Sequence, residues 1–276
     1  MKLRRADGGV IALELVGPAN GTPVLFCHGL AETRLSARRF APVAEQHGLR
    51  VVAPDRPGSG GTDPRRLARV ADWVEDASEV LDLLGVEKAQ LLGISAGGAY
   101  AAACAARMPD RVEGLTLVTP LGPPEWPTDG MAPWQRRSLQ LGRRTPGFGG
   151  WFLGRLALLA RHAPGLYFHV ITVEMPEPDR RALADGPTRA EFRASYLDAF
   201  CQGGGGVAQD LRLLTRPWGF DLGEIAVPTV VHHGDADTTV PLAHARRFAA
   251  TIPQARLEIH PGHGHFSIPA RSAWLT

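Results

Sequence analysis

The sequence contains few cysteines. Its 276 residues include three, Cys27, Cys104 and Cys201, which lie far apart and form no Cys-x-x-Cys pair. An odd number of widely spaced cysteines argues against a disulfide framework. We therefore expect a reducing, cytoplasmic location.

The chain also lacks an excess of charge of either sign. Thirty Lys and Arg residues against 28 Asp and Glu residues leave a formal net charge of +2. This is not the basic footprint of a nucleic-acid-binding protein, so we expect no nucleic-acid partner. A content of 44% hydrophobic and 21% charged residues excludes a disordered chain.

No long hydrophobic run is present. The most apolar region, residues 151–171, is interrupted by Arg155, Arg161 and His162, so we expect no membrane span. The basic start of the chain is followed by a short apolar stretch, residues 10–15, which Glu14 breaks. This pattern does not predict a secretory signal peptide.

Turn residues, by contrast, are abundant, with 32 glycines and 23 prolines. Between the turns lie short, continuous apolar runs at 24–27, 50–53, 89–92, 114–118, 229–232 and 257–260. Continuous runs are typical of strands that are covered on both faces of a parallel sheet. Helical patterns lie between them, at 70–84, 95–108 and 242–251, and residues 11, 13 and 15 alternate as in an antiparallel edge strand. The sequence predicts an α/β fold with a doubly wound, mostly parallel sheet.

Residues 121–215 interrupt this alternation. They contain no strand-like run, but they do contain helix-length patterns and many aromatic residues, including Trp126, Trp134, Trp151, Phe152, Tyr167 and Phe168. We expect residues 1–120 and 216–276 to form the sheet domain. Residues 121–215 are expected to form a helical cap over the carboxyl edge of the sheet, with a flexible joint at residues 203–206.

A serine lies on a sharp predicted turn between a strand and a helix. Gly93-Ile94-Ser95-Ala96-Gly97 directly follows the run at 89–92 and precedes the helical pattern. Glycine two positions before and after the serine relieves the clashes of such a turn, which presents the hydroxyl at the sheet edge. Ser95 is therefore the candidate nucleophile.

Two later loops supply candidates for an acid and a base. Asp235 and Asp237 follow the next-to-last predicted strand, and His263 and His265 lie on the glycine-rich loop after the last one. A carboxylate in that position can orient a histidine, which can act as the general base for the serine. The residues themselves leave open which Asp and which His serve.

Backbone groups on two turns are candidates for an oxyanion hole. His28-Gly29-Leu30 follows the first central strand, where a serine hydrolase supplies one N–H to the developing oxyanion. The N–H of Leu30 would pair with that of Ala96, the residue after the candidate nucleophile.

Together these motifs resemble the α/β-hydrolase fold family, in its esterase, lipase and haloperoxidase-like branch. The resemblance extends from about residue 23 to residue 266 and includes the segments 28–29, 55–60, 93–97, 234–241 and 264–266. It implies that Asp237 is the acid, with Asp235 as the alternative, and that His265 is the base, with His263 as the alternative. Relatives that use Asp as the nucleophile are disfavoured because this chain has Ser95.

The late histidines raise the question of a metal site. His263 and His265 could both bind zinc with Asp235 or Asp237, and His232 and His260 lie nearby in sequence. However, His232 and His260 end strands, along which neighbouring side chains point to opposite faces. We therefore expect neither a metal nor a cofactor.

The sequence thus predicts a serine hydrolase that forms an acyl-enzyme on a small to medium, largely apolar ester or related acyl compound. Alternatives with the same triad are carbon–carbon bond hydrolysis, acyl transfer and cofactor-free perhydrolysis. A non-catalytic ligand-binding protein of this fold is a further alternative. The sequence does not determine the oligomeric state.

Overall fold

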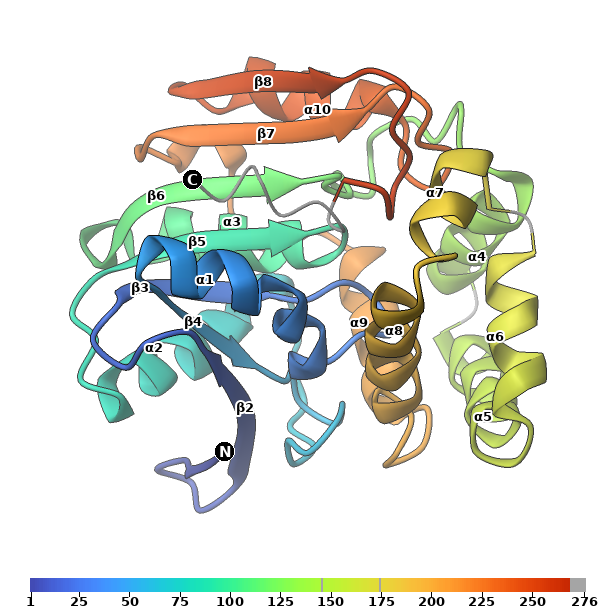
Figure 1. The fold of residues 1–276 in the computed structure, drawn as a ribbon, viewed down its shortest axis with the longest axis horizontal. Helices are drawn as coiled ribbons and strands as arrows, with labels where there is room; N and C mark the ends of the chain where they lie inside the picture. Colours follow the sequence, from blue (N-terminus) through green and yellow to red (C-terminus); the bar gives the residue numbers. More distant parts are fainter. Residues whose placement is uncertain (145, 174, 269–276) are drawn as a thin grey trace.

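The structure is a computed structural model, and it describes residues 1–144, 146–173 and 175–268. Figure 1 shows one twisted sheet with helices on both faces. The sheet has eight strands in the order β1-β2-β4-β3-β5-β6-β7-β8. The strands are β1 (Lys2–Arg4), β2 (Val10–Val16), β3 (Thr22–Cys27), β4 (Leu49–Pro54), β5 (Ala89–Ile94), β6 (Val112–Val118), β7 (Thr229–Gly234) and β8 (Ala255–His260).

Strands β3 to β8 pair in parallel, and β2 pairs antiparallel with β4. The continuous apolar runs form strands β3 to β8, and Val51, Val52 and Ala53 of β4 are fully buried. The run at 257–260 forms β8, which lies at the edge of the sheet and is only partly buried. The predicted antiparallel strand is present as β2, but its prediction as an edge strand was wrong. Strand β1 pairs along its outer side and forms the edge itself.

Helices cover both faces of the sheet and form two apolar cores. Trp73, Tyr100 and Phe248 belong to the core on one face, and Phe26 and Phe40 belong to the core on the other. In Figure 1, α1 lies in front of the sheet and α2, α3 and α10 lie behind it. These helices are α1 (Ala41–His47), α2 (Val74–Leu83), α3 (Gly97–Arg107) and α10 (Leu242–Thr251), and 3-10 helices at Arg34–Phe40 and Val70–Trp73 precede α1 and α2.

The described residues between 121 and 215 form helices and no strand. The helices are α4 (Pro133–Arg144), α5 (Pro146–His162), α6 (Pro164–Thr172), α7 (Glu177–Ala182), α8 (Gly186–Asp198) and α9 (Gly205–Leu214). They gather beyond the end of the sheet to which the parallel strands point (Figure 1). The side chains of Trp134, Trp151 and Phe152 lie outside the described residues.

The glycines at 203–206 allow two close backbone contacts. A Cβ at Gly204 would approach the carbonyl carbon of Leu153 to 2.7 Å, and one at Gly206 would collide with the carbonyl of Gly58. Only glycine therefore lets the start of α9 lie this close to α5 and to the loop after β4. No helix in the described ranges is both long and apolar enough to cross a membrane.

Candidate active site

Ser95 lies on the tight turn between β5 and α3. Its backbone has φ +55°, a left-handed conformation that is costly for a residue with a side chain. A Cβ at Gly93 would lie 2.7 Å from Cα of Gly98, and a Cβ at Gly97 would collide with the carbonyl oxygen of Cys27. The two glycines therefore make this turn possible, as the sequence predicts.

Ser95, His265 and Asp237 lie in one hydrogen-bonded chain. The Oγ of Ser95 is 3.0 Å from Nε2 of His265, and Nδ1 of His265 is 2.8 Å from Oδ2 of Asp237. The side chain of Asp237 is fully buried, and that of His265 is 4% exposed. The other oxygen of Asp237 accepts the N–H groups of Thr239 and Val240, at 2.8 and 2.9 Å. These bonds hold the carboxylate toward the imidazole.

The two alternative residues point elsewhere. Asp235 is exposed, and its Oδ1 accepts the N–H of Gly262 at 2.7 Å. Nδ1 of His263 lies 3.2 Å from Oγ of Ser267. Of the four candidates, the structure brings Asp237 and His265 to the serine.

Electrostatics favour the protonated form of His265. Burial by itself would lower the pKa of this imidazole, and the charge and hydrogen bond of the Asp237 carboxylate oppose that effect. With further contributions from Asp179 and Glu32, the pKa of His265 is raised above its ordinary value of 6.5. An imidazole that is stabilised in its protonated form can take up a proton from a neighbouring hydroxyl.

Leu30 and Ala96, the two candidates for the oxyanion hole, lie at the same cavity as Ser95. Both residues line one cavity with Ser95 and His265. Within the described part of the chain, neither N–H has a hydrogen-bond acceptor. Two unengaged N–H groups beside a serine hydroxyl can donate hydrogen bonds to a negatively charged oxygen.

A buried arginine fixes the loop that carries Leu30. Arg56, 1% exposed, donates to the carbonyl oxygens of His28 and Gly29 at 2.7 and 2.9 Å. Its charge is balanced by Asp210 of α9, 2.7 Å away. Burial strongly opposes the protonation of His28 and holds its pKa well below the ordinary value. This loop is therefore held by charge-assisted bonds from outside it.

A second carboxylate fixes the loop that carries His265. Asp179, in α7, is fully buried and accepts three consecutive backbone N–H groups, those of His265, Phe266 and Ser267, at 3.0, 2.8 and 3.0 Å. A Cβ at Gly264 would lie 2.5 Å from Oδ1 of Asp179, so glycine is required there. Burial raises the pKa of Asp179, while its proximity to His265 opposes that shift.

An apolar cavity of about 490 Å³ opens above Ser95. Its described walls come from the loops of the sheet and from the helices of residues 121–215. They are mainly aliphatic and aromatic, and include Leu30, Leu121, Leu153, Leu156, Tyr167, Ile171, Phe192, Tyr196, Phe200, Val207, Leu211 and Phe266. Of the aromatic residues that the sequence singles out, Tyr167 lines the cavity, whereas Trp126 packs against His244 and Phe248.

Sequence reasoning missed the roles of Asp179 and Arg56. Arg56 lies inside the segment 55–60 that carries the family resemblance, so a signal was available, but Asp179 lies in a region without motifs. Among the described residues, one group of His, Cys, Asp and Glu side chains has a spacing suited to a metal ion. It consists of His232, Glu258 and His260 and includes neither His265 nor Asp237.

Comparison with known proteins identifies the family and the fold. A family model described as "alpha/beta hydrolase fold" matches residues 22–269. The chain is 29% identical to the 2-hydroxymuconate semialdehyde hydrolase of Pseudomonas putida over 257 residues, which cover 90% of this chain and 82% of that one. Among solved structures, it is similar to a thermophilic esterase from Thermogutta terrifontis (TM-score 0.67, 24% identity, 100% and 95% covered). It is also similar to a bromoperoxidase from Bacillus anthracis (TM-score 0.73, 21% identity, 96% and 91% covered).

Proposed function

The chain belongs to the alpha/beta hydrolase fold family, and we propose that it is a serine hydrolase of apolar esters or related acyl compounds. The observation that carries this proposal is the hydrogen-bonded chain from Ser95 through His265 to Asp237, which opens onto the apolar cavity. Serine nucleophiles are activated by this arrangement of base and orienting acid.

In the first half-reaction, Oγ of Ser95 attacks the carbonyl carbon and its proton passes to Nε2 of His265. Asp237 accepts the Nδ1–H of the imidazole, which fixes the tautomer and stabilises the imidazolium. The N–H groups of Leu30 and Ala96 stabilise the negative charge on the former carbonyl oxygen. When the tetrahedral intermediate collapses, His265 returns the proton to the leaving alcohol, and the acyl group remains on Ser95.

In the second half-reaction, water gives a proton to His265 and attacks the acyl-enzyme. The resulting intermediate collapses, Ser95 recovers its proton and the carboxylic acid leaves. The reaction takes place beside a mainly apolar cavity, where the two N–H donors act at low dielectric.

The cavity walls support an apolar acyl or alkyl group as the recognised part of the substrate. Pockets of about 300–1,000 Å³ hold small-molecule ligands, and apolar walls favour hydrocarbon over charge. We propose that the helices of residues 121–215 act as a cap, because they supply most of these walls and thus select the substrate.

A fluorophosphonate probe tests the proposal, because it reacts covalently with activated serines. We expect the folded chain to be labelled at Ser95, the Ser95→Ala variant to be unlabelled, and a Ser78→Ala variant in α2 to be labelled like the wild type. Absence of labelling in the folded wild type would favour a non-catalytic ligand-binding protein.

A second candidate is hydrolysis of an acidic carbonyl compound of the kind named for the Pseudomonas putida relative. Such a compound carries a carboxylate, and Arg137 is a cation among the described wall residues. An Arg137→Leu variant distinguishes the two. If Arg137 binds the carboxylate of an acidic substrate, the variant should have a lower kcat/KM for that substrate. Its kcat/KM for neutral esters should stay unchanged in either case.

A further inference from the structure

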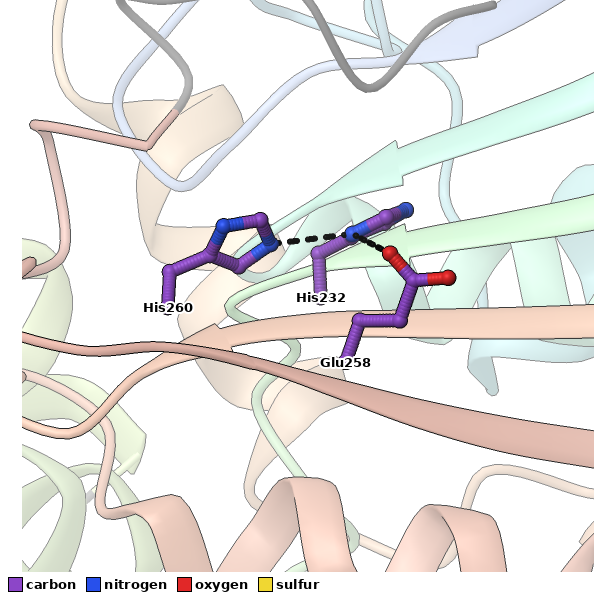
Figure 2. A group of neighbouring side chains, drawn as sticks. All are labelled: His232, Glu258 and His260. Atoms are coloured by element: carbon purple, nitrogen blue, oxygen red, sulfur yellow. Dashed lines mark hydrogen bonds and ion pairs between the residues drawn. The ribbon is translucent and has the colours of Figure 1, made fainter.

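Three potential metal-binding side chains lie on one face of the sheet, outside the active site. His232 is on β7, and Glu258 and His260 are on β8, the edge strand (Figure 2). The parallel register places His232 opposite Glu258, and His260 lies two residues further along the same strand. Because side chains alternate along a strand, Glu258 and His260 share a face, and His232 meets them there.

The donor atoms are spaced as ligands of one ion are. Nδ1 of His232 lies 3.1 Å from Nε2 of His260 and 3.4 Å from Oε2 of Glu258. Two ligands at zinc bond lengths in a tetrahedron are about 3.4 Å apart. The three atoms all lie within 4.8 Å of one another. The half-exposed side chain of Glu258 has freedom to close the remaining distance.

The hydrogen-bonding capacity of Nδ1 of His232 also favours a cation between the three side chains. A neutral imidazole presents at Nδ1 either one N–H or one lone pair. Two groups approach Nδ1 of His232, and the carboxylate oxygen among them can only accept. A divalent ion binds all three lone pairs at once.

From this geometry we propose that His232, Glu258 and His260 form a binding site for a divalent transition-metal ion of the zinc type. Two imidazoles and one carboxylate are a donor set that suits such ions, with water completing the coordination. The other oxygen of Glu258 lies 3.1 Å from Nη1 of Arg256, which orients the carboxylate and leaves Oε2 directed at the histidines.

The position of the site gives it a structural consequence. His232 lies five residues before Asp237, and His260 lies five residues before His265. An ion bound here joins the two strands whose following loops carry the candidate acid and base. Binding to the folded state therefore stabilises the sheet edge that supports them. The alternation of side chains along a strand argues against a metal site only for adjacent residues of one strand. The register between β7 and β8 places His232, Glu258 and His260 on the same face.

Zinc binding to the full, tag-free chain tests the site. After chelator treatment and dialysis, we expect calorimetric titration with Zn²⁺ to show one saturable site, and the melting temperature to rise with Zn²⁺. His260→Ala and Glu258→Gln should each weaken binding by about tenfold or more. Co²⁺ should give the visible absorption of a bound ion in the wild type, but not in His260→Ala.

Two histidine variants are matched controls. His47→Ala removes an exposed histidine of α1, and His265→Ala removes the imidazole next to Ser95; both should bind Zn²⁺ as the wild type does. Circular dichroism and metal-free melting temperatures establish that each variant is folded. The proposal is overturned if the wild type does not bind Zn²⁺, if His260→Ala and Glu258→Gln bind it equally well, or if His265→Ala alone abolishes binding.

Discussion

The carboxylate of Asp179, in helix α7, accepts the backbone N–H of His265 at 3.0 Å. The same carboxylate also accepts the next two N–H groups of the loop. A residue from the helical region thus holds the loop that presents the imidazole to Ser95. Asp179 does not touch the hydroxyl, so we regard it as a positioning residue.

We expect Asp179→Asn to impair catalysis more than substrate binding. An amide offers one acceptor oxygen and turns an NH₂ toward backbone donors. With the oxygen in the place of Oδ1, the N–H groups of Phe266 and Ser267 keep their acceptor, and the bond from the N–H of His265 is lost. Misplacing the imidazole by a fraction of an ångström should lower kcat by about tenfold to a hundredfold, with a smaller change in KM. Steady-state kinetics and the rate of fluorophosphonate labelling measure this effect.

Asp185→Asn is the control for that variant. Asp185 caps α8 in the same region and accepts the N–H of Thr188, but it is exposed and does not contact the loop of His265. It should lose at most about 1 kcal/mol of stability and no activity. Equal kcat for Asp179→Asn and Asp185→Asn would contradict the positioning role.

The pH dependence of kcat/KM should follow the titration of the His265 imidazole. This residue must be neutral to accept a proton. Burial lowers its pKa, but the carboxylates of Asp237, Asp179 and Glu32 together raise it above 6.5. Activity should therefore be lost as the pH falls through a midpoint above 6.5. In Asp237→Asn the effect of burial is no longer opposed by that charge, so the midpoint of the residual activity should move to lower pH. Asp235→Asn should keep the wild-type midpoint.

Removing Arg56 should separate stability from activity. Arg56→Met leaves the carboxylate of Asp210 buried without its partner, so we expect a loss of about 3–5 kcal/mol in the free energy of unfolding. Adding Asp210→Leu should recover part of this loss. Activity should stay low in the double variant, because the carbonyls of His28 and Gly29 lose their donors and the N–H of Leu30 is no longer held. Full activity in a stable double variant would refute this role.

The cavity should set the length of acyl group that is accepted. Leu156, in α5, lines the cavity, whereas Leu158, two residues later, is 51% exposed. Leu156→Trp should fill part of the space and shift the optimum of kcat/KM toward shorter acyl chains in a series of p-nitrophenyl esters. Leu158→Trp should leave the profile unchanged. The same profile in both variants would place the acyl group elsewhere.

Local signals in the sequence carried most of the fold and the three candidate catalytic residues. The turn at Ser95 has its glycines within two positions, and Asp237 and His265 lie on loops that directly follow apolar strands. Strand β1 was missed because Lys2–Arg4 is short and mostly charged, so its pairing depends on the neighbouring strand rather than on its own residues.

The contacts that Asp179 and Asp210 make with distant segments could not be predicted. Asp179 reaches a loop 86 residues away, and Asp210 reaches Arg56 across 154 residues. Each is one acidic residue among many in a helical region, and only the packed structure shows that it is buried against a donor. The cluster of His232, Glu258 and His260 depends in the same way on the register between β7 and β8.

The central claim, that Ser95 is acylated during turnover, is tested most directly by mass spectrometry of the chain quenched soon after mixing with a p-nitrophenyl ester. We predict one acyl adduct on the peptide that contains Ser95, and we predict that kcat falls by about 10⁴–10⁶ in Ser95→Ala. Turnover by Ser95→Ala at the wild-type rate, with no adduct on Ser95 in the wild type, would contradict the account.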